Sequence, residues 1–135
     1  MNVLTVGVEE EFHILSRQTG RLASEAAAVL SCDNTAKNQG DIKGEMPLSQ
    51  LEITTPVCIS ITELHKSLSQ LRLTASEMAR KAGCYLVASG TPFSGDATGQ
   101  AFAEEELVTA LVGYCPCYIG YTYRELVKCR CIASD

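Results

Sequence analysis

The sequence predicts an α+β or α/β domain in which one amphipathic helix covers a face of a small sheet. Three observations lead to this class. Apolar residues recur at helical spacing through residues 60–82, segments with strand-like patterns lie on both sides of that stretch, and 46% of the 135 residues are apolar. A chain of this length and composition forms one domain, or part of a larger one, and can build a core.

The first part of the chain predicts a strand, a turn and a short helix. Apolar and polar side chains alternate over residues 2–15, and the polar residues 16–20 that follow end in glycine, as in a turn. Ser24 has the side chain of a helix N-cap and precedes an Ala-rich segment, residues 25–30. Residues 32–43 are polar and contain glycine, so we expect a loop or a weak edge hairpin there.

The next part predicts two strands with the long helix between them. Residues 51–57 are rich in β-branched side chains and reach a proline near their end, which indicates a strand. Ser60 and Glu63 form a capping-box pair at the start of the helix, and Gly83 stands where a left-handed residue ends one. Residues 84–89 are a short apolar run, which indicates a further strand.

Two glutamates of the first strand form the first candidate site. Glu9 and Glu11 lie two residues apart, so their side chains share one face with Cα atoms about 7 Å apart. Like charges this close repel unless a cation or solvent separates them, and Mg²⁺ prefers carboxylate oxygens. The alternative is a solvated strand edge that simply carries three glutamates.

A third glutamate strengthens the metal hypothesis. Glu52 lies inside an otherwise apolar strand, where a buried carboxylate is costly without a partner. Glu45, seven residues earlier, can approach the same place from the loop that enters this strand. We therefore expect Glu9, Glu11, Glu45 and Glu52 to form a metal site. His13 shares the face of Glu9 and Glu11, but we expect it at an edge or in the core rather than as a ligand.

Charge and composition exclude several classes of protein. Eleven basic and sixteen acidic residues give a net charge of −5, which argues against a nucleic-acid or anionic-membrane surface. No apolar run reaches the ~18 residues of a membrane span, and three glutamates interrupt the place of a signal peptide. We expect a cytoplasmic protein, and the odd count of seven cysteines argues against a disulfide framework.

The last part of the chain is rich in cysteine. Residues 104–112 and 123–131 each fit a short helix. Four of the cysteines crowd this region in two close pairs: Cys115 with Cys117, and Cys129 with Cys131. Four thiolates suit tetrahedral zinc, although the spacing within each pair is tighter than usual, and reduced cysteines are the other interpretation.

Three segments together resemble a known family. They are Gly-Val-Glu-Glu-Glu-Phe at 7–12, Leu-Glu-Ile-Thr-Thr-Pro-Val-Cys at 51–58 with Glu45 before it, and Ala-Ser-Gly-Thr-Pro-Phe at 88–93. In these segments the chain resembles the N-terminal part of the glutamate–cysteine ligase type 2 family, the carboxylate–amine ligases of bacteria and archaea. The resemblance divides the chain into residues 1–93, part of the ligase catalytic domain, and 94–135, a divergent Cys-rich tail.

The resemblance implies a fold and a reaction. The fold is part of a glutamine-synthetase-like catalytic domain, an antiparallel sheet with helices packed on one face. The implied reaction uses ATP to phosphorylate the γ-carboxylate of glutamate, after which the amine of cysteine, or another amine, attacks the acyl phosphate. Glu9, Glu11 and Glu52 match the family's Mg²⁺ ligands, and Glu45 falls where the family has a further acidic residue.

The departures from the family pattern shape the remaining expectations. Family members are much longer than this chain, and the histidine that the family commonly has between Thr91 and Pro92 is missing. We therefore expect a truncated ligase that is inactive alone, whose incomplete sheet favours a homo-oligomer. The alternative is a small non-catalytic binding or structural protein, stabilised by zinc at the tail cysteines.

Overall fold

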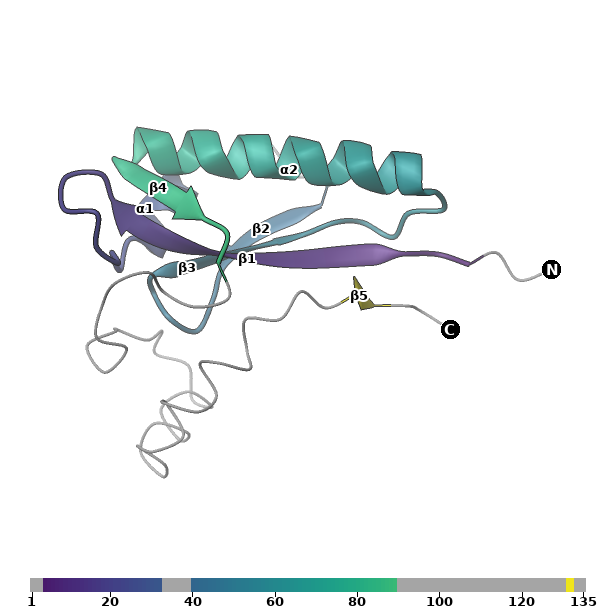
Figure 1. Ribbon diagram of the computed structural model, residues 1–135, viewed down its shortest axis with the longest axis horizontal. Coiled ribbons are helices and arrows are strands. Elements are labelled where there is room, and N and C mark those ends of the chain that lie inside the picture. Colours follow the sequence, from purple (N-terminus) through teal and green to yellow (C-terminus); the bar gives the residue numbers. More distant parts are fainter. Residues whose placement is uncertain (1–3, 33–39, 90–130, 133–135) are drawn as a thin grey trace, which may run out of the picture.

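The described part of the chain folds into an antiparallel sheet with two helices. A computed structural model describes residues 4–32, 40–89 and 131–132 (Figure 1). In chain order the elements are β1 (Gly7–Ser16), α1 (Ala26–Ser31), β2 (Asp41–Gly44), β3 (Gln50–Thr54), α2 (Ile61–Lys81), β4 (Cys84–Val87) and β5 (Cys131–Ile132).

The sheet places β1 at its centre. The strand order is β2-β3-β1-β4, every pairing between these strands is antiparallel, and β5 pairs with β1 through Gly7 and Val8. All described pairings are thus antiparallel, which agrees with α+β and not with the α/β alternative. The relationship to glutamine synthetase stays a prediction.

The long helix begins and ends as its sequence predicts. The Ser60 Oγ accepts a hydrogen bond from the Glu63 N–H at 3.2 Å, and the Glu63 carboxylate accepts one from the Ile59 N–H at 2.9 Å. These contacts satisfy backbone donors that the first turn of a helix leaves free. After Lys81 the chain turns through Gly83, which has a φ of +75°. The predicted capping pair is confirmed.

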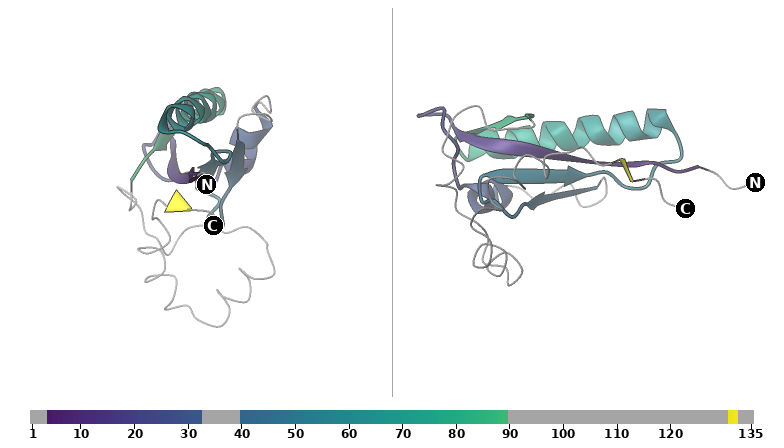
Figure 2. Two further views of the ribbon diagram at one scale, coloured as in Figure 1. Left: turned by 90° about the vertical axis from the view of Figure 1, so that its right-hand side faces the viewer. Right: turned by 60° about the horizontal axis from the view of Figure 1, so that its bottom comes forward.

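One core joins the helices to the sheet. In the right-hand view of Figure 2, α2 runs along the sheet. Alternation along β1 and β3 directs Ile14, Leu51 and Ile53 toward the helices, and all three are fully buried. The helices and β4 contribute the remaining buried apolar side chains: Ala26, Val29, Leu71, Ala75, Met78, Ala79 and Cys84. No helix in the described part of the chain is long and apolar enough to cross a membrane.

Several element boundaries differ from the predicted ones. Strand β1 begins at Gly7, and α1 has Glu25 at its N-cap without a side-chain hydrogen bond, so the prediction of Ser24 as the cap is wrong. Residues 41–44 form the edge strand β2, so the edge hairpin was the correct alternative there. Strand β3 ends at Thr54, two residues before Pro56, which has no N–H to donate. The contact with the N-terminal segment continues through hydrogen bonds between Thr55 and Val8 and a bridge between Val6 and Cys58. The helix expected over 123–131 is wrong at Cys131, which lies in β5, and the rest of that segment lies outside the described residues.

Candidate functional site

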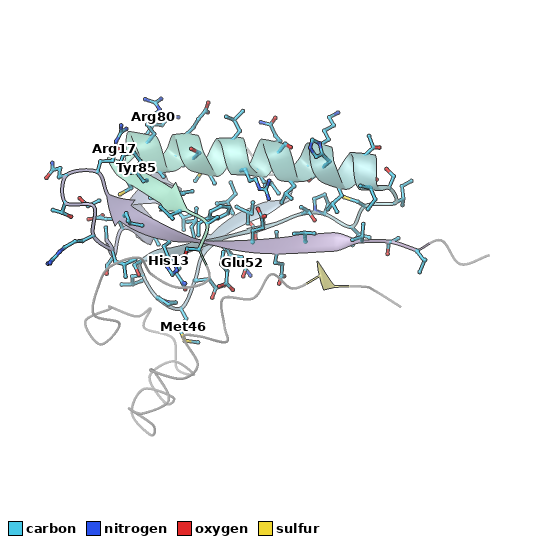
Figure 3. All side chains as sticks on the ribbon, in the orientation of Figure 1. His13, Arg17, Met46, Glu52, Arg80 and Tyr85 are labelled. Atoms are coloured by element: carbon cyan, nitrogen blue, oxygen red, sulfur yellow. The ribbon has the colours of Figure 1, made fainter. Side chains whose placement is uncertain are left out.

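One side of the sheet is apolar and faces the helices, and the other is polar. Glu52 and His13 lie on the side away from α2 (Figure 3). The same alternation that buries Leu51 and Ile53 presents Gln50, Glu52 and Thr54 on this second side. We use the name acidic face for the following residues of β1, β2 and β3: Glu9, Glu11, Asp41, Lys43, Glu52 and Thr54.

The strand register aligns these residues in two rows. Glu11 is opposite Glu52, which in turn is opposite Lys43. In the next row Glu9 is opposite Thr54, which is opposite Asp41. Directly opposed residues on one face have Cβ atoms about 5 Å apart. The register therefore brings Glu11 and Glu52 together from distant parts of the sequence.

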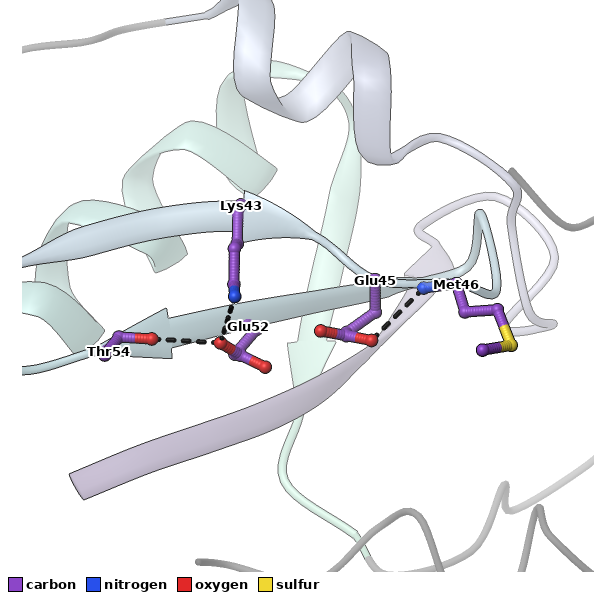
Figure 4. A network of polar contacts seen from close by, with 5 residues as sticks. All are labelled: Lys43, Glu45, Met46, Glu52 and Thr54. Carbon is purple, nitrogen blue, oxygen red and sulfur yellow. Dashed lines mark hydrogen bonds and ion pairs between the residues drawn. The ribbon is translucent and has the colours of Figure 1, made fainter. Parts of the chain in front are cut away.

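Glu52 is the buried centre of this face. The residue is 6% exposed, and its Oε1 lies 2.9 Å from the Lys43 Nζ and accepts a hydrogen bond from the Thr54 hydroxyl at 2.9 Å (Figure 4). Burial by itself raises the pKa of Glu52, but the hydrogen bonds from Glu45, Lys43 and Thr54 outweigh it and hold that pKa below the ordinary value. Glu52 is therefore ionised at neutral pH in spite of its burial.

Glu45 follows β2 and lies beside Glu52. Its Oε2 accepts a hydrogen bond from the Met46 N–H at 3.2 Å (Figure 4). Burial raises the pKa of Glu45, and the hydrogen bond with Glu52 raises it further. The two carboxyl groups thus differ in proton affinity, and a proton shared between them belongs to Glu45.

The structure brings the four predicted ligands to one region but does not close a cage. Glu9 and Glu11 share the acidic face with Glu52, and Glu45 reaches Glu52 from the turn between β2 and β3. Within residues 4–32, 40–89 and 131–132, no three His, Cys, Asp or Glu side chains converge as a metal site. The donors, carboxylate and hydroxyl oxygens, nevertheless suit a hard cation such as Mg²⁺.

Three residues near these glutamates have roles that the sequence pattern leaves open. Lys43 and Thr54 hold Glu52, and the expected edge hairpin was the only sequence signal that could have found Lys43. Glu10 lies on the opposite side of the sheet, where the Arg72 Nε donates to its Oε2 at 2.7 Å and a second Arg72 nitrogen bonds its Oε1. The middle glutamate of the three is therefore a structural ion-pair partner.

His13 has the core position that the sequence analysis expected. It is 1% exposed, and the Gln50 Nε2 lies 3.5 Å from its Nδ1. Burial lowers the pKa of His13, and a hydrogen bond with the backbone of Ser89 opposes this only in part. The ring is neutral at pH 7 and packs at the end of the acidic face.

Of the four cysteines near the end of the chain, the structure places only the backbone of Cys131, in β5. Cys115, Cys117 and Cys129 lie outside the described residues, as does the histidine-lacking segment at 91–92. Among the described residues Cys32, Cys58 and Cys84 are free thiols. The zinc interpretation therefore receives no support here.

Comparisons with known proteins agree on one family. Residues 5–100 match the family described as Glutamate-cysteine ligase family 2 (GCS2). A protein of Rubrobacter xylanophilus named "Putative glutamate--cysteine ligase 2-3" is 36% identical over 91 residues, which make up 67% of this chain and 25% of that protein.

Two further relatives are named "Putative glutamate--cysteine ligase 2" and "Putative glutamate--cysteine ligase 2-2". The one from Salinispora tropica is 42% identical over 91 residues, 67% of this chain and 24% of the relative. The one from Saccharopolyspora erythraea is 37% identical over 109 residues, 75% of this chain and 28% of the relative. The chain spans about a quarter of the length of the curated relatives it matches.

Proposed function

Because the chain belongs to glutamate–cysteine ligase family 2, we propose that it contributes the acidic, cation-binding sheet face of an ATP-dependent carboxylate–amine ligase. The observation that carries this proposal is the buried, ionised Glu52 opposite Glu11 on a face that no helix of the described chain covers. A carboxylate in such a position has a large desolvation cost, which a bound cation would offset.

The proposed reaction has two steps, a phosphoryl transfer and the attack of an amine. A γ-carboxylate oxygen of glutamate attacks the γ-phosphorus of ATP, which forms γ-glutamyl phosphate and releases ADP. The amine of cysteine, or of another small molecule, then attacks the acyl carbon, phosphate leaves with the bonding electrons, and an amide remains after loss of one proton. Phosphoryl transfer of this kind depends mainly on positioning and on neutralisation of charge.

Four glutamates would hold the cation in this proposal: Glu9, Glu11, Glu45 and Glu52. Mg²⁺, when bound, would neutralise charge on the phosphate and carboxylate oxygens of the substrates. Burial raises the pKa of Glu45 and the contacts of Glu52 lower its pKa, so Glu52 is the more readily ionised of the two ligands. Thr54 and Lys43 keep the Glu52 carboxylate in one orientation.

In this proposal the described segment binds the cation, and the complete reaction needs further parts of a longer ligase. The relatives carry about three quarters of their length outside the matched region, so we propose that the described residues alone do not complete the reaction. The free thiols of the described part are consistent with a reducing, cytoplasmic location. Self-association through an unpaired edge of the sheet stays a prediction.

Calorimetric titration of the folded chain with Mg²⁺, ATP and glutamate tests this function. We expect binding by the wild type and at least a tenfold loss of affinity in Glu52→Gln and in Glu11→Gln. The matched control is Glu10→Gln, which removes the same charge from β1, the strand of Glu11, but on the opposite side of the sheet. Equal affinities in Glu52→Gln and wild type, or equal losses in Glu10→Gln and Glu52→Gln, would contradict the assignment.

A further inference from the structure

Lys43 occupies an unusual position for a surface lysine. Its side chain is 51% exposed, whereas its partner Glu52 has only 8% of its side chain exposed. The ammonium reaches inward from the edge strand β2 and lies 2.9 Å from the Glu52 Oε1 (Figure 4). A half-exposed ammonium thus lies on the most buried carboxylate of the acidic face.

The surroundings of Lys43 coincide with the proposed cation ligands. In the strand register Lys43 is opposite Glu52, which is opposite Glu11, and Glu45 follows two residues after Lys43. Lys43 therefore shares its part of the sheet with three of the four proposed ligands. A divalent cation that binds Glu52 through both carboxylate oxygens would have to share the Oε1 with the Lys43 Nζ or take its place.

We propose that Lys43 is a resident counter-ion, which occupies the cation position on Glu52 in the ion-free protein and is displaced when a divalent cation binds. This inference rests on the proposed function, because it uses the same glutamates. The exchange keeps Glu52 neutralised in both states, so the buried carboxylate is never left without a cation. Lys43 has solvent-exposed space to move into, since β2 is the last strand on its side of the described sheet.

The exchange makes Lys43 a competitor that weakens divalent binding. Removing a partly exposed ion-pair partner relieves a competition that corresponds to about a fivefold change in affinity. We therefore expect Lys43→Met to bind Mn²⁺ about fivefold more tightly than the wild type, measured by electron paramagnetic resonance of free Mn²⁺. Lys43→Arg keeps the counter-ion and should retain an affinity close to that of the wild type.

The matched control is Lys66→Met. Lys66 is exposed on α2, on the other side of the sheet, and its removal changes the net charge of the chain by the same amount. An equal gain of affinity in Lys66→Met and Lys43→Met would show a general charge effect and would overturn the inference. Unchanged or weaker Mn²⁺ binding by Lys43→Met would also overturn it, while wild-type binding that depends on Glu52 would leave the proposed function intact.

A second measurement on the wild-type chain does not depend on a variant. Acetylation by an N-hydroxysuccinimide ester, read by peptide mass spectrometry, should be slow at Lys43 without metal and at least twofold faster with saturating Mg²⁺, with Lys66 unchanged. An unaltered Lys43 rate in a chain that binds Mg²⁺ would refute the displacement. No Mg²⁺ or Mn²⁺ binding by either the wild type or Lys43→Met would refute the proposed function and this inference together.

Discussion

Gly40 provides a sharp prediction because it lies where the site-bearing strand β2 begins. Its φ of +128° is a conformation that residues with a side chain rarely adopt. A Cβ at this position would lie 2.3 Å from the Thr54 carbonyl oxygen and 2.8 Å from the Leu71 Cδ1. Neither backbone angle nor space therefore permits alanine without a shift of β2, β3 or α2.

The expected loss of stability has two components, backbone strain and steric overlap. Backbone strain at an unfavourable φ costs about 1–3 kcal/mol, and forced overlap in a packed region costs about 1–3 kcal/mol more. We expect Gly40→Ala to lower the free energy of unfolding by about 4 kcal/mol, a large fraction of the roughly 5–15 kcal/mol of a typical domain. Because β2 leads to Glu45 and pairs with the strand that carries Glu52, the same variant should also weaken cation binding.

Two other glycines serve as graded controls. Gly83 also has a positive φ, +75°, but a Cβ added there would have no atom within 4 Å, so Gly83→Ala should cost about 1 kcal/mol. At Gly44 a Cβ would meet Ala26 at an ordinary 3.6 Å, so Gly44→Ala should change stability by less than about 0.5 kcal/mol. Urea unfolding followed by circular dichroism measures all three. A Gly40→Ala variant as stable as Gly44→Ala would refute this reasoning.

Three further predictions concern the core, the buried histidine and a buried thiol. Leu71 is fully buried, so Leu71→Ala should lower the free energy of unfolding by about 3 kcal/mol. Leu73 is 55% exposed on the same helix, so Leu73→Ala should lower it by less than about 1 kcal/mol. Urea unfolding measures both, and equal losses would contradict the packing of α2. Because the pKa of His13 is lowered from 6.5, its stabilising contribution is complete above that pH and declines as the pH falls toward the folded-state pKa. Urea unfolding at pH 7.5 and 5.5 should show this decline in the wild type and a smaller one in His13→Gln, and identical declines would contradict it. Burial and the charge of Glu63 raise the pKa of the Cys58 thiol. Iodoacetamide should therefore label Cys58 slowly in the native chain and readily in urea, as measured by mass spectrometry. Fast labelling of the native chain would argue against the burial of Cys58.

Local patterns were sufficient for much of the fold. The Ser60–Glu63 pair and the apolar stripe after it predicted α2 because capping and amphipathicity act within a few residues. Alternation along β1 correctly separated Glu9 and Glu11 from Glu10. These features need no knowledge of which strands become neighbours.

The partners of the glutamates required the register between strands. Opposition of Glu11 to Glu52, and of Lys43 to Glu52, depends on pairings between segments far apart in the chain, which a sequence pattern does not specify. The same holds for Arg72, whose ion pair with Glu10 connects α2 to β1. The sequence therefore predicted the acidic residues of the site but not the basic and hydroxyl groups that hold them.

Line broadening by Mn²⁺ in the amide NMR spectrum tests most directly whether the acidic face binds a cation. If the acidic face binds the ion, the amide signals of Glu11 and Glu52 should broaden at the lowest Mn²⁺ concentrations, and Mg²⁺ should reverse the effect. The exposed carboxylates of α2, Glu63 and Glu77, are the internal controls, and their amides should broaden later. Broadening that begins at Glu63 or Glu77, or that is uniform along the chain, would contradict the account.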